Sequence, residues 1–153
     1  MAKQRDAVRM SEHEVAAFLD GAKTLTVATL DREGAPHLTA LWFARAGDLL
    51  LFETYGASQK LVNLRRDPRI AVQCEAGEHY DELRGVSIQG TAEIVDSEPR
   101  LTELMTAIVA RNLGGLEPQP LASHVAAMVR KRVVVVVHPR KVMSWDHRKL
   151  AKR

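Results

Sequence analysis

Five consecutive valines at positions 133–137 constrain the fold of this chain more than any other segment. Valine is stiff at χ1 and is enriched in strands, so the run predicts a strand that begins near Arg132. A strand with one solvated face alternates apolar and polar residues, and this one does not. It is therefore expected to be buried on both faces or to close a barrel. Pro139 is expected to break the strand, which residues 141–145 then resume.

The other predicted strands are mostly joined by short turns. Because the first three follow one another closely, they are expected to form three neighbouring antiparallel strands. A parallel doubly wound sheet needs a helix between successive strands throughout, and that alternation is missing. With about six strands and helices inserted singly, the pattern indicates a mainly β fold, an antiparallel barrel decorated by helices. The predicted strands cover residues 24–30, 36–45, 49–54, 69–74 and 84–95.

Local signals mark where the helices begin. Ser11 and Glu14 have the spacing of a capping box, which starts a helix over residues 12–20. Ser97 is expected to cap another helix, because the apolar residues that follow it repeat at helical spacing. A weaker helical pattern covers residues 121–130.

Length, charge and composition limit the classes of protein to which this chain can belong. The 153 residues are expected to form a single domain, with residues 1–10 as a flexible N-terminal extension. The formal net charge of +3 suits anionic small molecules as well as nucleic acid. Aromatic residues are 5% of the chain and do not interleave with a basic face, which disfavours a nucleic-acid-binding barrel. No apolar stretch reaches the roughly eighteen residues of a membrane span, so a cytoplasmic protein without a membrane partner is expected.

The sequence lacks the motifs of metal and side-chain catalysis. The six histidines never pair at metal-ligand spacing, so no metal site is predicted. Residues 85–89 are similar to a nucleophile elbow, but Gln89 replaces its last glycine. The single cysteine, Cys74, lies in an apolar run and is expected to be a buried thiol. Any catalysis is therefore expected to belong to an organic cofactor, and no catalytic side chain is predicted.

The segment at 55–68 predicts a binding site for an anion. It reads as a turn that opens a short helix directly after a strand, with Ser58 as the N-cap. Unsatisfied N–H groups at a helix start, with Lys60 in the first turn, favour a phosphate or a carboxylate. A capped surface helix with a solvated lysine is the alternative that these residues leave open.

Four segments in this order resemble the split β-barrel flavin and deazaflavin oxidoreductases, the superfamily of pyridoxamine 5'-phosphate oxidase. The chain looks closest to the branch that uses the deazaflavin coenzyme F420. The resemblance implies a split antiparallel β-barrel of the FMN-binding type. The longer arginine-rich C-terminal motif of true pyridoxamine phosphate oxidases is missing, which argues against vitamin B6 as the substrate. The four segments are residues 26–30, 34–43, 58–68 and 90–95.

The resemblance also implies where a cofactor lies. The phosphate is expected at Ser58 and Lys60, and the ring system along the end of the second strand, at residues 39–42. The family forms homodimers with two cofactor sites at the interface, so the partner subunit is expected to contribute from the long strand and the C-terminal segment. The cofactor-binding residues predicted in this way are Thr39, Ala40, Leu41, Trp42, Ser58, Gln59, Lys60, Asn63, Arg65, Ser87, Gln89, Trp145 and Arg148.

Structural roles stay open for several of these residues. Trp42 and Trp145 either stack on the ring or fill the barrel, where each indole N–H needs a partner. Ser87 and Gln89 are equally consistent with the outward face of a half-buried strand. Arg65 is a candidate for the path of the anionic F420 tail, together with Arg66 and Lys149, or it covers the helix surface with its aliphatic stem.

The function predicted on this basis is hydride transfer from reduced F420 to an unsaturated or electrophilic small molecule. FMN in place of F420 is the nearest alternative. A protein that carries or senses F420, FMN or haem without turnover is a second class of function. The substrate is not predicted, because the loops at 76–83 and 114–120 that shape the pocket contain no motif.

Overall fold

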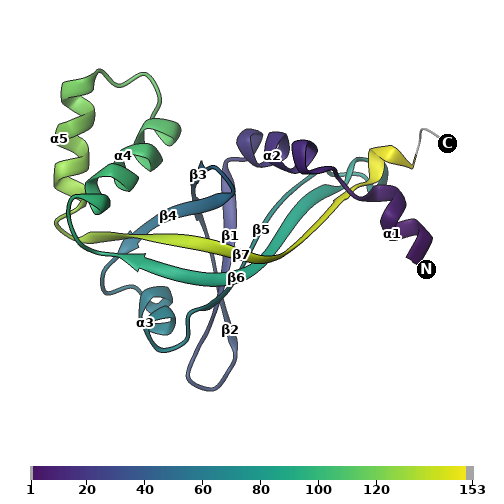
Figure 1. The fold of residues 1–153 in the computed structure, drawn as a ribbon, viewed down its shortest axis with the longest axis horizontal. Helices are drawn as coiled ribbons and strands as arrows, with labels where there is room; N and C mark the ends of the chain where they lie inside the picture. Colours follow the sequence, from purple (N-terminus) through teal and green to yellow (C-terminus); the bar gives the residue numbers. More distant parts are fainter. Residues whose placement is uncertain (1, 151–153) are drawn as a thin grey trace.

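The computed structural model of the protein describes residues 2–150, in which one curled sheet carries helices at its edges and ends (Figure 1). The helices are α1 (Ala2–Val8), α2 (Glu12–Gly21), α3 (Gln59–Arg66), α4 (Arg100–Asn112) and α5 (Pro118–Met128), with short 3-10 turns η1 (Tyr80–Glu82) and η2 (His147–Lys149). The strands are β1 (Thr24–Leu30), β2 (Pro36–Trp42), β3 (Ala44–Ala46), β4 (Leu49–Tyr55), β5 (Arg69–Ala76), β6 (Arg84–Val95) and β7 (Arg132–Asp146).

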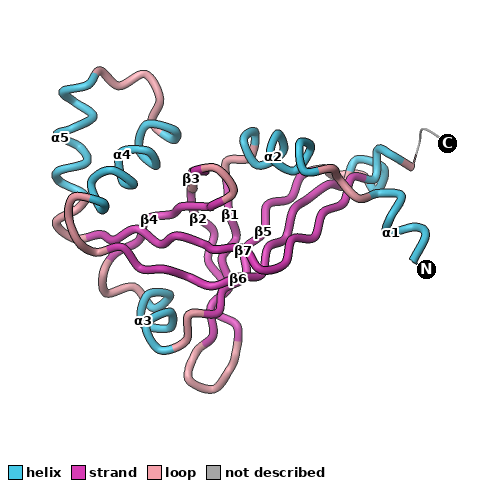
Figure 2. Tube along the Cα trace, in the orientation of Figure 1, coloured by secondary structure: helices cyan, strands magenta, loops and turns pink. Residues whose placement is uncertain are grey.

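The sheet is antiparallel throughout and runs in the order β2-β1-β5-β6-β7-β4-β3. Figure 2 shows the sheet curling on itself, while α2 and α3 lie on opposite sides of the barrel. The prediction of a mainly β, split antiparallel barrel is confirmed.

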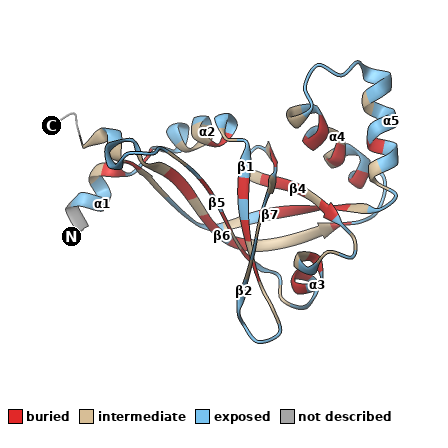
Figure 3. Ribbon diagram, turned by 180° about the vertical axis from the view of Figure 1, so that it is seen from behind, coloured by how far each residue is buried: buried red, intermediate tan, exposed pale blue. Residues whose placement is uncertain are grey.

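The valine run lies in β7 and is buried on both faces, as predicted. Val133, Val135 and Val137 belong to the core inside the barrel, together with residues of β1, β5 and β6. Val134 and Val136 belong to a second core beneath α4 and α5. Figure 3 shows this buried segment of β7 between the barrel and the helical hairpin. One strand therefore holds two apolar layers together.

The predicted antiparallel pairings of the three strands after α2 are both present, but the middle strand is not continuous. The strand expected over residues 36–45 divides into β2 and β3, and β4 pairs with β3 and β7. At the division, the carbonyl oxygen of Phe43 accepts hydrogen bonds from the side chains of Arg111 and Asn112 on α4. Residues 50–55 of β4 also pair with residues 132–137 of β7, which include the valine run, and a local reading of short turns does not reveal this pairing.

Pro139 does not interrupt β7, contrary to the sequence prediction. The register between β6 and β7 shifts at Gln89 and Gly90, and Gly90 lies opposite Pro139. A Cβ added at Gly90 would lie 2.1 Å from the carbonyl oxygen of His138, so a side chain has no room there. The glycine and the bulge accommodate the proline within a continuous strand.

Helix starts were predicted with mixed success. The capping box of α2 is confirmed, because Ser11 and Glu14 bond each other's backbone N–H groups. Ser97 is not the cap of α4, which begins at Arg100, and the Glu98 carboxylate accepts hydrogen bonds from the first turn instead.

The expected N-terminal extension contains α1, and Val8 and Met10 are buried. No helix within residues 2–150 is both long enough and apolar enough to span a membrane. In the same part of the chain, no cluster of His, Cys, Asp or Glu side chains is arranged to hold a metal ion. Cys74 is buried, and burial raises the pKa of its thiol to about 11.

Candidate functional site

The start of α3 carries a chain of polar side chains at the end of β4. The hydroxyl of Thr54 donates to the Ser58 hydroxyl oxygen at 2.9 Å, and the ammonium group of Lys60 donates to the Thr54 oxygen at 3.3 Å. Ser58 is the N-cap of α3, as predicted, and its side chain accepts a hydrogen bond from the backbone N–H of Leu61. The lysine is therefore held close to the positive end of the helix.

Glu53, the acid that acts on the charge of Lys60, is already paired with Arg132. Burial lowers the pKa of Lys60 below its ordinary value of 10.5, and the Glu53 carboxylate opposes this shift. Both oxygens of that carboxylate accept hydrogen bonds from Arg132, at 2.8 and 2.7 Å. Arg132 also donates to the Tyr55 hydroxyl oxygen. A half-buried ammonium whose neighbouring acid is already paired is suited to an incoming anion.

Asn63 joins α3 to the inside of the barrel. Its side-chain amide donates to the Thr29 hydroxyl oxygen at 3.0 Å, and its oxygen accepts from Gln59 at 2.9 Å. Asn63 is completely buried, so any part that it has in binding is indirect, through the placement of α3.

The inner face of β2 continues this polar surface. His37 lies opposite Thr29, and Thr39 lies opposite Val27, so both side chains face the same way as these buried residues of β1. His37 Nδ1 and Thr39 Oγ1 are buried without a hydrogen-bond partner within residues 2–150. Trp42, at the end of β2, is 54% exposed. It therefore does not fill the barrel.

An open groove of about 1050 Å³ lies on another side of the molecule, between α1 and α2 on one wall and β6 and β7 on the other. Ser87 and Trp145 line it, and Gln89 lies two residues beyond Ser87 on the same strand face, opposite Lys141. The Trp145 ring packs against Gly85, where an added Cβ would lie 2.3 Å from the ring. The groove includes none of the residues of the α3 corner, defined here as Thr54, Ser58, Gln59, Lys60 and Asn63.

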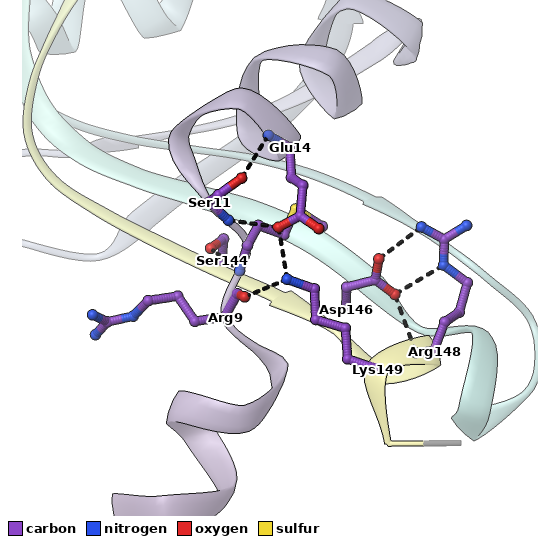
Figure 4. Close-up of polar contacts among 8 residues, drawn as sticks. Arg9, Ser11, Glu14, Ser144, Asp146, Arg148 and Lys149 are labelled. Atoms are coloured by element: carbon purple, nitrogen blue, oxygen red, sulfur yellow. Dashed lines mark hydrogen bonds and ion pairs between the residues drawn. The ribbon is translucent and has the colours of Figure 1, made fainter. Parts of the chain in front are cut away.

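The C-terminal segment binds the protein's own N-terminal region (Figure 4). Lys149 donates to the backbone oxygen of Arg9 at 2.7 Å and to Glu14 at 2.6 Å. Arg148 donates to both carboxylate oxygens of Asp146, and this contact lowers the pKa of Asp146. Both basic side chains thus have intramolecular partners.

The two arginines near the end of α3 differ in their contacts. Arg66 donates to the backbone oxygen of Leu30. Arg65 is exposed and makes no ion pair within the described part of the chain. Arg65 is therefore the better placed of the two for the tail of a bound ligand.

Most of the predicted site residues fall into three groups, while Arg65 lies near the end of α3, Gln89 lies beyond the groove lining on β6, and Arg148 pairs with Asp146. Ser58, Gln59, Lys60 and Asn63 meet at the α3 corner, residues 39–42 lie on edge strand β2, and Ser87 and Trp145 line the groove. Sequence reasoning missed Thr54, Glu53, Arg132 and His37. Thr54 contacts Ser58 and Lys60 locally, whereas Arg132 reaches Glu53 through the pairing of β4 with β7, and His37 lies opposite Thr29 through the pairing of β1 with β2. Strand alternation could have placed Thr54 inward, but no local signal pairs Glu53 with Arg132.

Comparison with known proteins places this geometry in a family. The sequence matches the family described as pyridoxamine 5'-phosphate oxidase over residues 11–146. The chain belongs to this family. The match contains the α3 corner, β2 and most of the groove-lining strands, so the candidate site lies within the family's shared domain.

Several solved structures are similar to this chain. The conserved hypothetical protein Rv2991 from Mycobacterium tuberculosis is 43% identical with a TM-score of 0.90, over 96% of this chain and 91% of that chain. An F420 reductase is 25% identical with a TM-score of 0.61, over 82% of this chain and 93% of that one. HutZ, the haem storage protein of Vibrio cholerae, shares the fold at 15% identity and a TM-score of 0.69, over 87% and 94% of the two chains. No curated protein sequence matches this chain.

Proposed function

We propose that this protein is an F420-binding oxidoreductase that reduces an unsaturated or electrophilic small molecule. The observation that carries the proposal is the α3 corner. Lys60 lies there at the start of a helix, and the Glu53 carboxylate that acts on its charge is already paired with Arg132. F420 held there in its reduced form would provide a hydride, which carries two electrons, and solvent would provide the proton that completes the reduction of the acceptor.

The residues present fit a large anionic cofactor. Lys60 and the N–H groups at the start of α3 suit its phosphate. Along β2, the unpartnered His37 Nδ1 and Thr39 Oγ1 are polar atoms that a heterocycle or a polyol chain would satisfy. The chain's own residues would bind and orient the cofactor and exclude water from it.

Two observations favour F420 over FMN. The F420 reductase is 25% identical to this chain over most of both lengths. In addition, F420 carries a negatively charged chain of glutamates. Arg65, which is exposed on α3 and makes no ion pair in the described part of the chain, is a cation that these glutamates could approach. Exposed cations attract such a tail, although the attraction is screened by salt.

The proposed site needs a second subunit. The α3 corner and the groove that contains Ser87 and Trp145 are separate surfaces of one chain. Leu38 and Trp42 of β2 and Val142 and Met143 of β7 are exposed apolar residues, which are suited to an interface. In a homodimer the groove side of one subunit would complete the α3 corner of the other.

Storage or transport of a cofactor without turnover is the second candidate function. The fold shared with the haem storage protein HutZ motivates it, and the likeness concerns the fold alone. Binding of F420 without reduction of any acceptor would favour this candidate.

Separate titrations of the purified protein with F420 and with FMN test the proposal. Cofactor fluorescence and absorption should change at lower concentrations of F420 than of FMN, and added salt should weaken F420 binding. Reduced F420 should then be oxidised in the presence of an unsaturated acceptor. Tighter binding of FMN would move the assignment to the FMN-dependent branch, and binding of neither cofactor would refute it.

A further inference from the structure

Arg132 is a second basic side chain beside the α3 corner, and three contacts hold it. It begins β7 and lies opposite Tyr55 at the end of β4. One terminal nitrogen donates to both oxygens of the Glu53 carboxylate at 2.8 and 2.7 Å, and the other donates to the Tyr55 hydroxyl oxygen at 2.7 Å. The guanidinium also stacks on the Tyr55 ring, with 3.9 Å between its central carbon and the ring centre. These contacts fix the position of Arg132.

The backbone places the pair of Glu53 and Arg132 beside the start of α3. The N–H of Gly56, the residue after Tyr55, donates to the backbone oxygen of Lys131 at 3.0 Å. The end of β4 and the start of β7 therefore meet at the turn that precedes α3. The charge of Glu53 also reaches the lysine of the α3 corner, because this carboxylate opposes the lowering of the lysine's pKa by burial.

The Glu53–Arg132 pair limits the positive charge that the α3 corner offers to a ligand. Lys60 and Arg132 are both cations, and Glu53 compensates one of them. The side chains of Glu53 and Arg132 are only 21% and 26% exposed, so solvent and salt screen their charges less than at an open surface. A single uncompensated cation is therefore available to an anion that binds at the start of α3.

This charge distinguishes two kinds of phosphate. A phosphodiester carries one negative charge near neutral pH. A phosphate monoester loses a second proton at about pH 6 and carries a charge of about −1.5 to −2 at pH 7. Glu53 would repel the additional charge of a monoester, and no second free cation would compensate for it. FMN ends in a phosphate monoester, whereas the phosphate of F420 is a phosphodiester.

We propose that Glu53 determines the cofactor preference of the α3 corner. By holding Arg132, Glu53 withholds a second cation from the ligand and favours a phosphodiester over a phosphate monoester. The inference rests on the proposed function, because it takes the α3 corner as the phosphate site. It goes beyond that function by assigning the selectivity to a positioning residue that acts through Arg132.

The monomethyl ester of FMN provides a test that needs no substitution. This compound has the same flavin as FMN, but its phosphate is a phosphodiester. The wild type should bind the methyl ester about threefold or more tighter than FMN, because only the charge of the phosphate differs. Quenching of flavin fluorescence at pH 7 measures both affinities. Equal affinities, or tighter binding of FMN, would overturn the proposal.

Glu53→Gln tests the residue itself, since it removes the negative charge and keeps the size of the side chain. FMN should bind about tenfold tighter to this variant than to the wild type. F420 and the methyl ester should gain about threefold, because a single charge gains about half of the free energy. Riboflavin, which lacks the phosphate, should bind equally to both proteins.

Two further variants separate the effect of charge from a change of structure. The double substitution Glu53→Gln with Arg132→Gln restores the single cation, so the ratio of FMN affinity to F420 affinity should return to that of the wild type. Glu117→Gln removes the same negative charge directly before α5, away from α3 (Figure 1), and should leave this ratio unchanged. The melting temperatures of the apo variants show that each is folded.

The outcomes separate this inference from the proposed function. An unchanged ratio in a folded Glu53→Gln protein that still binds F420 would overturn the role of Glu53 and leave the cofactor assignment intact. A wild type that prefers FMN to F420 would refute the proposed function, and the comparison of FMN with its methyl ester would still decide the role of Glu53. Binding of none of these compounds would overturn both.

Discussion

The side-chain amide of Asn63 donates a hydrogen bond to the Thr29 hydroxyl oxygen at 3.0 Å, and both side chains are buried. This contact ties α3 to β1 and thereby fixes the direction of the helix start. Asn63→Ala should lower the free energy of unfolding by about 2–3 kcal/mol, because it removes two hydrogen bonds and leaves Thr29 without a partner. Urea denaturation of the apo protein measures the change.

The matched control for Asn63 is Val62, its neighbour on the exposed side of α3. Val62→Ala should change the free energy of unfolding by less than about 0.5 kcal/mol. If Asn63→Ala keeps normal stability while cofactor binding is lost, Asn63 contacts the cofactor directly and the anchoring role is wrong.

Lys60→Ala should weaken F420 binding about tenfold to a hundredfold, because a charge-assisted contact to the phosphate is lost. The apo protein should melt at an unchanged or slightly higher temperature, since the burial of Lys60 opposes its charge. Lys23→Ala, in the exposed connection between α2 and β1, is the charge-matched control. Undiminished affinity in the Lys60 variant would remove the main support for the α3 corner as the phosphate site.

The pH dependence of binding tests the same ammonium group. Burial lowers the pKa of Lys60 in the apo protein, and a bound anion would raise it again. Lys60 carries its charge below its pKa, so F420 affinity should fall as pH rises through the lowered value towards 10.5. In Lys60→Ala this part of the pH dependence should disappear. An identical alkaline decrease in both proteins would assign it to another group.

Substitution of His37 is expected to weaken cofactor binding without lowering the stability of the apo protein, whereas substitution of Asn63 is expected to lower that stability. Its Nδ1 has no hydrogen-bond partner within residues 2–150, so His37→Leu should leave apo stability unchanged or raise it by up to about 1 kcal/mol. Cofactor affinity should fall about tenfold if Nδ1 bonds to the ligand. His124→Leu, on the exposed side of α5, controls for the loss of a histidine. A destabilised His37 variant with normal binding would identify a structural residue.

Elements with local end signals were predictable from the sequence. The capping box of Ser11 and Glu14 starts α2, and the predicted bounds of β1 and β6 agree with the structure. Ser58 was predicted as the N-cap of α3 for the same reason. These signals act over a few residues and need no knowledge of the rest of the fold.

Features that depend on distant partners were not predictable in this way. The pairing of β4 with β7 and the continuity of β7 across Pro139 follow from contacts between distant strands of the sheet. At the site, the pairing of Glu53 with Arg132 joins residues far apart in the sequence and changes the electrostatics around Lys60. The unpartnered Nδ1 of His37 likewise becomes evident only when β2 lies against β1.

Lys149→Met should loosen the N-terminal region, because it removes the contacts of Nζ with the Arg9 backbone oxygen and with Glu14. Amides of residues 4–10 should exchange hydrogen faster than in the wild type. Lys141→Met removes a nearby charge that holds no ion pair in the described chain and should leave exchange unchanged. Unchanged exchange in Lys149→Met would show that the apolar contacts of Val8 and Met10 are sufficient.

The titration of Glu14 gives a second measure of the same contact. The hydrogen bond from Lys149 and that from Ser11 lower the pKa of Glu14 below its ordinary value of 4.5. A depressed carboxyl pKa stabilises the fold above 4.5, and this contribution is lost as pH falls through the lowered value. The amide chemical shift of Ser11 should report a midpoint below 4.5 that moves upward in Lys149→Met. A midpoint unaffected by the substitution would contradict the contact.

Leu38→Asp should convert a dimer into a monomer, because it places a charge on the exposed apolar face of β2 that also carries Trp42. Sedimentation velocity at micromolar concentration should show a dimer for the wild type and for Leu116→Asp, a matched change in the exposed loop before α5. The monomeric variant should also lose most of its F420 affinity, since the α3 corner and the groove would no longer meet. A monomer that binds F420 as tightly as the wild type would refute the two-subunit site while leaving the α3 corner intact.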